Sequence, residues 1–250
     1  MIGSAGLGYW PDPPDQRDRP LATLGLDASP PPSASVERFM VSIPNQGKTN
    51  SCVGQAVRQA LGIEQSRLSG HQAPPTSGLG HYYVGRIQHG VEDVDAGTWN
   101  RAVLKGLKYH GPMLESDWPF DANKVNVRPR WRAFQNAFDL RGPHAYYRID
   151  GAADERLDAV RRAVASGHGV VFGTSVARSF LSATGPALID KPSPNEEIVG
   201  GHAMCVVGYE PGKFLIANSW GTNWREHGRA WLTDDYLAWI RTQDIWVVAL

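Results

Sequence analysis

Apolar residues in the first half of the chain recur every three or four positions, which is the spacing of one face of an α-helix. The longest such run follows Cys52 and ends near Gly70, so we expect Cys52 at the N-terminus of a helix. Thr98 and Asp154 are suitable N-cap residues for two later helices. The predicted later helices cover residues 98–111, 131–138 and 154–167.

The pattern changes after residue 168, where short segments rich in β-branched and aromatic residues alternate with glycine, proline and asparagine turns. The strands predicted from these segments cover residues 169–176, 202–209, 213–218, 229–232 and 245–250. Helices first and strands second favour an α+β protein with two lobes rather than a βαβ sheet. We expect a helical lobe over about 46–140 and a β lobe over about 141–250.

Residues 1–45 have a different composition, rich in proline, aspartate and serine. Proline fixes φ and has no backbone N–H, so it disfavours regular packed elements. We therefore predict an extended arm that lies on the domain.

Composition and charge narrow the classes of function. The 25 Lys and Arg residues are balanced by 25 Asp and Glu residues, so neither nucleic acid nor a membrane surface is an expected partner. No apolar run approaches the roughly 18 residues of a membrane helix. The chain has two cysteines and no Sec-type signal peptide, which favours a cytoplasmic protein that is stable through packing alone. No metal or cofactor is expected, because no set of ligands with metal-site spacing is visible.

A group of residues far apart in the sequence suits nucleophilic catalysis. A helix N-terminus would stabilise the thiolate of Cys52, and an imidazolium at His202 would lower its pKa further. Asn218 would accept the other imidazole N–H and orient the ring, with Trp220 shielding that bond from water. Gln46 lies six residues before Cys52, so its amide would donate to the oxygen of a tetrahedral intermediate.

The segments around these residues resemble papain-family (C1-type) cysteine peptidases. The similar segments are residues 46–52, 200–204 and 218–224, the last with the family's Asn-Ser-Trp-Gly sequence, and also residues 95–98 and 115–120, which resemble the bacterial branch. The resemblance spans about residues 40–250. It implies a helical lobe and an antiparallel, barrel-like β lobe, with Cys52 and His202 facing each other across a cleft. It also implies hydrolysis of a peptide or protein substrate through a thioester acyl-enzyme.

The same resemblance suggests a substrate-binding region. Gly97 would hydrogen-bond the substrate backbone, and a pocket for the side chain preceding the cleaved residue would be lined by Thr98, Trp99, Gly201 and Ala203. None of these residues is acidic, so we expect an apolar or aromatic side chain there rather than Arg or Lys.

The chain departs from the family pattern in several ways. Val53 follows the nucleophile where an aromatic residue is usual, Arg225 replaces a glycine, and the usual disulfides are absent. Residues 1–45 are too short for the inhibitory prodomain of secreted members. We therefore predict that the arm packs along the lobes and partly restricts the cleft, and an inhibitor or regulatory protein is a further potential partner.

Two other functions are compatible with the same residues. A transamidase would use the same acyl-enzyme with an amine as acceptor. A binding or structural protein on a peptidase scaffold is the other, since fold does not fix function. The complete set of Cys52, His202, Asn218 and Gln46 argues against a mere scaffold.

Overall fold

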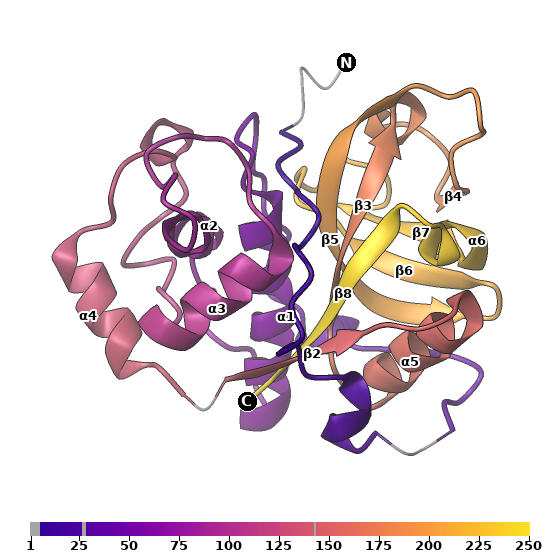
Figure 1. The fold of residues 1–250 in the computed structure, drawn as a ribbon, viewed down its shortest axis with the longest axis horizontal. Coiled ribbons are helices and arrows are strands. Elements are labelled where there is room, and N and C mark those ends of the chain that lie inside the picture. Colours follow the sequence, from indigo (N-terminus) through magenta and orange to yellow (C-terminus); the bar gives the residue numbers. More distant parts are fainter. Residues whose placement is uncertain (1–5, 27–28, 143) are drawn as a thin grey trace.

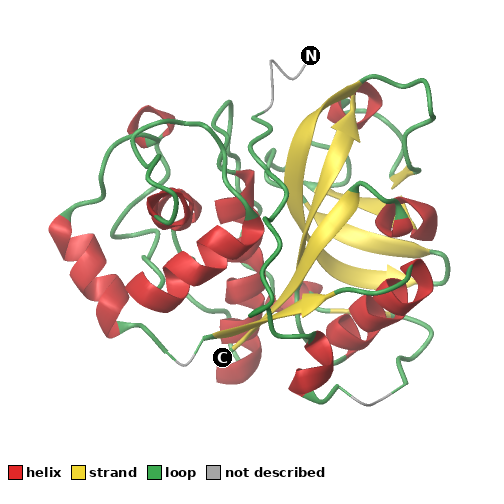
Figure 2. Cartoon of the chain, viewed as in Figure 1, coloured by secondary structure: helices red, strands yellow, loops and turns green. Residues whose placement is uncertain are grey.

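The computed structural model describes residues 6–26, 29–142 and 144–250. Parts of the predicted arm (residues 1–5 and 27–28) and residue 143 of the predicted β lobe lie outside the described residues. A long central helix, α1, separates a group of helices from the sheet, and the N-terminal segment passes between the two groups (Figures 1 and 2).

Most of the α-helices precede most of the strands along the chain, as the sequence predicts. The α-helices are α1 (Cys52–Ser69), α2 (Gly78–Ile87), α3 (Asn100–His110), α4 (Trp131–Asp139), α5 (Ala153–Ala165) and α6 (Asp234–Ala238). The strands are β1 (Ala34–Ser35), β2 (Ala145–Ile149), β3 (Val170–Ala177), β4 (Leu188–Ile189), β5 (Ile198–Glu210), β6 (Lys213–Ala217), β7 (Arg229–Thr233) and β8 (Thr242–Ala249). No described helix combines the length and apolar character needed to cross a membrane.

The strands form a mostly antiparallel sheet in the order β2-β8-β3-β5-β6-β7-β4, with β1 also paired to β5. The β4–β7 pair is parallel. Because the end strands of this path do not pair with each other, the sheet is open, and the expected barrel-like closure is wrong within the described residues. The α+β class is confirmed.

Helix α1 positions Cys52 as its first residue, as predicted. The helix ends at Gly70, whose φ of 73° is a left-handed conformation that glycine adopts without strain. Most of α1 is buried, because it packs on α2 and α3 on one side and on β5 on the other (Figure 1). The N-terminus of α1, with Cys52, therefore lies between the helical group and the sheet.

Several local predictions need correction. α3 is capped by Trp99 rather than Thr98, and α5 by Ala152 rather than Asp154. Strand β5 begins at Ile198, four residues before the predicted strand 202–209, and so includes Gly200 and Gly201. Helix α2 and strand β2 were not predicted.

The N-terminal arm contains two short 3₁₀-helices (Leu21–Leu24 and Glu37–Phe39) and is packed into the molecule. Tyr9, Asp12 and Leu21 are buried, and Ala34–Ser35 pairs with β5 as the short strand β1. The arm is therefore part of the folded core, and the prediction that it contains no packed element is wrong.

Candidate active site

Cys52 is the first residue of α1, and β5, the strand that carries His202, runs beside it. Cys52 is fully buried. His202 lies in β5 opposite Thr174 of β3. The backbone N–H of Ala203, the residue after His202, approaches the sulfur of Cys52. The strand that carries the imidazole thus runs directly past the thiol.

The imidazole of His202 is fixed on two sides. Its Nε2 lies 2.7 Å from Oδ1 of Asn218, and since this oxygen only accepts, Nε2 carries the proton. The Trp220 ring is stacked on the His202 ring, with centroids 4.5 Å apart and planes at 28°. In the neutral ring Nδ1 is then the free base, and it has no hydrogen-bond partner among the described residues.

Burial controls the protonation of this pair. It raises the pKa of the Cys52 thiol to about 11, against the opposing effect of the backbone N–H groups of Ala203 and Gly8. It lowers the pKa of His202 to about 4, against the opposing effect of the hydrogen bond to Asn218. In the arrangement observed, the neutral thiol and neutral imidazole are favoured. The predicted thiolate–imidazolium pair needs a more solvated site.

Gln46 is also fully buried, and its backbone N–H donates to the carbonyl oxygen of Ser219, the residue after Asn218. Its Nε2 donates to the carbonyl oxygen of Thr49 at 2.7 Å and to that of Gly6 at 3.2 Å. Its Oε1 accepts a hydrogen bond from the hydroxyl of Ser219, which fixes the orientation of the amide. The donor that was expected to bind an oxyanion therefore binds a carbonyl oxygen of the arm.

The arm occupies the cleft between the two walls. The carbonyl of Gly8 accepts from the N–H of Thr98 at 2.8 Å, and the N–H of Trp10 donates to the carbonyl of Thr98 at 3.0 Å. On the other wall, the N–H of Tyr9 donates to the carbonyl of Gly201 at 3.2 Å. The Gly8 N–H approaches the Cys52 sulfur. The arm therefore covers the thiol at Gly8.

Glycines on the arm and on the cleft walls allow the arm to approach the walls closely. A Cβ on Gly8 would lie 1.9 Å from the carbonyl oxygen of Asn50, and one on Gly201 would lie 2.3 Å from that of Tyr9. A Cβ on Gly97 would lie 2.4 Å from the carbonyl oxygen of Gly8. Any side chain at these positions would displace the arm or the cleft wall.

Tyr9 fills a pocket that contains an acid which sequence analysis missed. Its ring lies against Gly173 and Gly201, so that a Cβ on Gly173 would fall 2.0 Å from the ring. Its hydroxyl donates to Asp244. Asp244 belongs to β8, far from every recognisable motif, and only the pairing of β3 with β8 brings it here. Of the four residues predicted to line the substrate pocket, Gly201 lies against the Tyr9 ring, and Asp244 was not among the predicted residues.

The other predicted substrate-binding residues lie around the arm. The N–H of Gly97 donates to the Tyr82 hydroxyl, and Thr98 makes the backbone hydrogen bonds between this wall and the arm. Trp99 stacks on His89, with centroids 4.3 Å apart, and Ala203 is buried beside Cys52.

Asp12 anchors the arm below this pocket. Its carboxylate accepts from the backbone N–H of Arg101 at 2.9 Å and from Trp246 Nε1 at 2.8 Å, and it lies 3.6 Å from the Arg148 guanidinium. Its own N–H donates to Asp244 at 2.7 Å. Burial, together with the nearby charge of Asp244, raises the pKa of Asp12 to about 7.

The arm does not fill the whole region around the catalytic candidates. A cavity of about 550 Å³ lies on the side of Trp220 and Gly221, with Asn45 and Gly47 opposite. Among the described residues, no group of three or more His, Cys, Asp or Glu side chains could hold a metal ion.

Comparison with known proteins agrees with this geometry. The family model described as papain family cysteine protease matches residues 88–242, more than half of the chain, a range that includes His202 and Asn218 but begins after Cys52. The solved structure of xylellain, a cysteine protease from Xylella fastidiosa, is 28% identical with a TM-score of 0.86, and the match covers 100% of this chain and 97% of that one.

Two further proteins are similar. An uncharacterised peptidase C1-like protein of Acanthamoeba polyphaga mimivirus is 28% identical over 98% of this chain and 87% of its own length. Digestive procathepsin L 3 of Tenebrio molitor is 19% identical with a TM-score of 0.69, covering 100% of this chain and 76% of that one, which shows a common fold. The chain belongs to the papain family of cysteine proteases and is a cysteine peptidase.

Proposed function

We propose that Cys52 is the nucleophile of this peptidase and that His202 is its general acid and base. The observation that carries the proposal is the passage of β5 beside the thiol, with the N–H of Ala203 at the Cys52 sulfur. The bond between His202 and Asn218 supports it, because it leaves Nδ1 as the unpartnered ring nitrogen. Trp220 covers the ring and keeps water from that bond.

The reaction proceeds in two stages. The Cys52 thiolate, formed when its proton passes to His202, adds to the carbonyl carbon of the substrate, and the carbonyl π electrons move to oxygen. The Nε2 group of Gln46 and the backbone N–H of Cys52 stabilise this oxyanion. Collapse breaks the C–N bond, and His202 gives its proton to the leaving amine. Water then attacks the thioester carbon, losing a proton to His202, and collapse of this second intermediate breaks the C–S bond. The acid product leaves as the proton on His202 returns to the Cys52 thiolate.

Labelling with an E-64-type epoxide tests the nucleophile. We expect one equivalent attached to Cys52, no labelling in Cys52→Ala and unchanged labelling in Cys205→Ala. The control is matched because Cys205 is the other buried thiol and lies in the same region, three residues after His202. Labelling of Cys205, or peptidase activity that survives in Cys52→Ala, would overturn the assignment.

The arm would act as a built-in restriction of the cleft. It takes up the backbone groups of Thr98 and Gly201, and Gly6 engages the amide of Gln46, so peptide substrate and arm compete for the same partners. The same contacts support hydrolysis over a scaffold role, because a protein without activity has no need of a covered nucleophile. Partitioning between water and an added amine would separate hydrolysis from transamidation.

The pocket filled by Tyr9 would take the substrate side chain that precedes the cleaved residue. Tyr9 indicates an aromatic ring with a hydrogen-bond donor at its tip, because its hydroxyl donates to Asp244. Arg148 lies 3.0 Å from Asp244 and compensates its charge, so an aromatic side chain remains preferred over Arg or Lys. Since hydrogen bonds to charged groups contribute about 1.5–3 kcal/mol, we expect Tyr to exceed Phe in kcat/KM by about tenfold or more. Asp244→Asn should reduce this ratio, and a strong preference for Arg would contradict the pocket.

We also propose that the enzyme works in the cytoplasm. Cys52 and Cys205 are both free thiols, which suits a reducing compartment. Fractionation of the producing cells with compartment markers would test this.

A further inference from the structure

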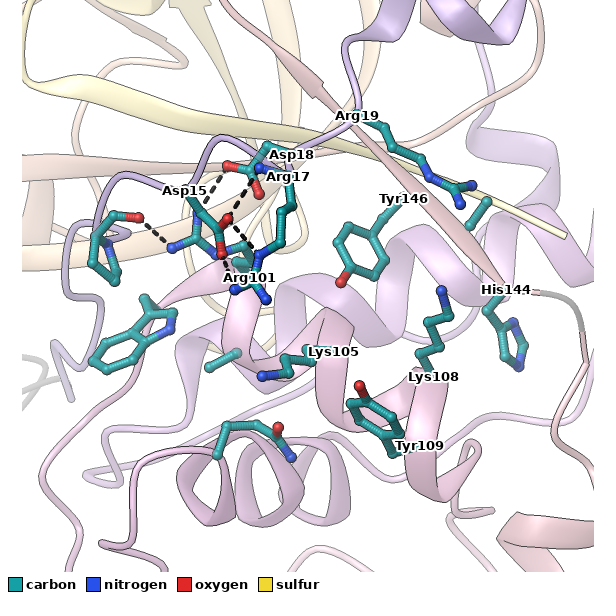
Figure 3. A pocket seen from close by; sticks show the side chains of 15 residues that line it. Asp15, Arg17, Asp18, Arg19, Arg101, Lys105, Lys108, Tyr109, His144 and Tyr146 are labelled. Atoms are coloured by element: carbon teal, nitrogen blue, oxygen red, sulfur yellow. Dashed lines mark hydrogen bonds and ion pairs between the residues drawn. The ribbon is translucent and has the colours of Figure 1, made fainter.

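A cavity of about 420 Å³ lies at the foot of the arm, away from Cys52. Its walls are the arm between Pro13 and Arg19, one face of α3, and the start of β2 (Figure 3). The cavity therefore exists only while the arm lies against α3. Any ligand that contacts both walls would bind the docked arm more tightly than the released one.

The walls carry an excess of positive charge. The cationic residues are Arg17, Arg19, Arg101, Lys105 and Lys108, and the acidic ones are Asp15 and Asp18. This leaves three positive charges in excess, in a chain whose formal net charge is zero. An anion is therefore the class of ligand that the cavity favours.

Both carboxylates are already paired. Asp15 accepts two hydrogen bonds from the guanidinium of Arg17, at 2.8 and 2.7 Å. Asp18 lies 2.7 Å from Arg101 and also contacts Arg148. The Asp18–Arg101 pair joins the arm to α3, and because both carboxylates are paired, they leave little negative charge for the remaining cations.

Three cations remain without an acidic partner. Arg19, Lys105 and Lys108 form no ion pair with any carboxylate of the described residues. Lys105 and Lys108 are exposed and three residues apart on α3, so they share one face of the helix. Figure 3 shows both lysines below the arm, with Tyr109 and Tyr146 beside Lys108. Tyrosine hydroxyls are additional hydrogen-bond donors for an anion.

From this arrangement we infer that the cavity binds a compact polyphosphate, which links Arg19 of the arm to Lys105 and Lys108 of α3 and holds the arm over the cleft. Arginine and lysine are the side chains that bind phosphate most effectively, and several phosphate groups in a row match cations on two opposing walls. The effect on the cleft rests on the proposed restriction by the arm. The polyphosphate would be a stabiliser of the inactive, covered state.

The shared chemistry is a chain of phosphate groups, from an inorganic polyphosphate or from a nucleoside triphosphate. Titration with inorganic triphosphate and with a nucleoside triphosphate distinguishes the sources. Equal affinities would indicate that the phosphates alone are recognised. Tighter binding of the nucleotide would indicate that the rings of Tyr109 and Tyr146 also contact the base.

Calorimetric titration of the full-length Cys52→Ala protein with inorganic triphosphate tests the site without peptidase activity. We expect one saturable site whose affinity falls as NaCl is raised. Lys105→Ala/Lys108→Ala should weaken binding by about tenfold or more. Arg130→Ala/Arg132→Ala is the matched control, because it removes two exposed positive charges near α4 and should bind normally. No saturable binding, or equal binding by the two double variants, would overturn the site.

Hydrogen exchange tests the link to the arm in the same protein. The amides of Tyr9 and Trp10 donate across the cleft, so triphosphate should slow their exchange, and this protection should disappear in Lys105→Ala/Lys108→Ala. Saturable binding with no change at these amides would overturn the link. Neither measurement needs the enzyme to be active, so a failure of the proposed catalytic residues would leave both results intact.

Discussion

The substitution Gly8→Ala should release the arm from the cleft. The added Cβ would lie 1.9 Å from the carbonyl oxygen of Asn50 and 2.5 Å from its Cβ. The Asn50 loop cannot easily move, because its backbone N–H and side-chain amide both bond to Asp95, the latter at 2.7 Å. The arm is therefore the part that must shift.

The size of the effect follows from this overlap. Overpacking by one methyl group typically costs about 1–3 kcal/mol, which corresponds to an increase of about 5- to 150-fold in the population of the released arm. Substrate binds only when the arm is released, so the apparent affinity scales with that population. We expect kcat/KM to rise by at least about fivefold, mainly through a lower KM.

A fluorogenic peptide with Tyr before the cleaved residue, with enzyme concentration set by epoxide titration, provides the assay. Gly142→Ala is the matched control, because position 142 is exposed and the nearest atom to its added Cβ is 3.9 Å away. Faster exchange at the Tyr9 and Trp10 amides would verify that the arm is released. A released arm with unchanged kcat/KM would refute the argument that the arm competes with substrate.

Other predictions concern protonation and the oxyanion. Burial beside Asp244 raises the pKa of Asp12 to about 7, so the docked arm binds a proton more tightly than the released arm. Docking of the arm should therefore weaken as the pH rises from about 4 through 7. Amide exchange at Tyr9, compared with the Asp12→Asn variant at each pH, measures this weakening. A pH dependence equal in the two proteins would contradict it. Burial raises the pKa of Cys52 to about 11, so alkylation of its thiol by iodoacetamide should be slow at neutral pH and faster in Gly8→Ala. Mass spectrometry measures the alkylation rate, and identical pH profiles in the two proteins would exclude this effect of the arm. Gln46→Ala should lower kcat by about 10²–10³, with the melting temperature as a control for the lost bonds to Thr49 and Ser219, and an unchanged kcat would remove Gln46 from the oxyanion site.

The sequence was most informative where local chemistry determines structure. Cys52 begins α1 because an apolar run of helical spacing follows it, and Gly70 ends the helix because it adopts a positive φ. Helix α2 was not predicted because its glycines weaken the helical pattern. Those glycines are needed for packing: a Cβ on Gly85 would lie 2.5 Å from the Val103 side chain of α3. Close contact between helices is a tertiary property, which a periodic pattern does not contain.

The arm and the Tyr9 pocket were hidden from sequence analysis for a related reason. Proline-rich composition argued against regular packed elements, but the burial of Tyr9 depends on partners more than 90 residues away, including Gly173, Gly201 and Asp244. Each of these is an ordinary residue in its own segment, and only the strand order brings them together.

Covering the cleft and neutralising the catalytic pair have the same physical cause. The arm excludes water from Cys52, and low hydration favours the uncharged thiol and imidazole over the ion pair. When the arm leaves, water and then substrate reach the same atoms, and the helix N-terminus and the imidazolium can stabilise the thiolate. With Cys52 as the proposed nucleophile, the docked arm would oppose catalysis twice, by occupying the bonds that a substrate needs and by disfavouring the thiolate. A variant that loosens the arm changes both together, which is why accessibility and thiol reactivity should rise in parallel.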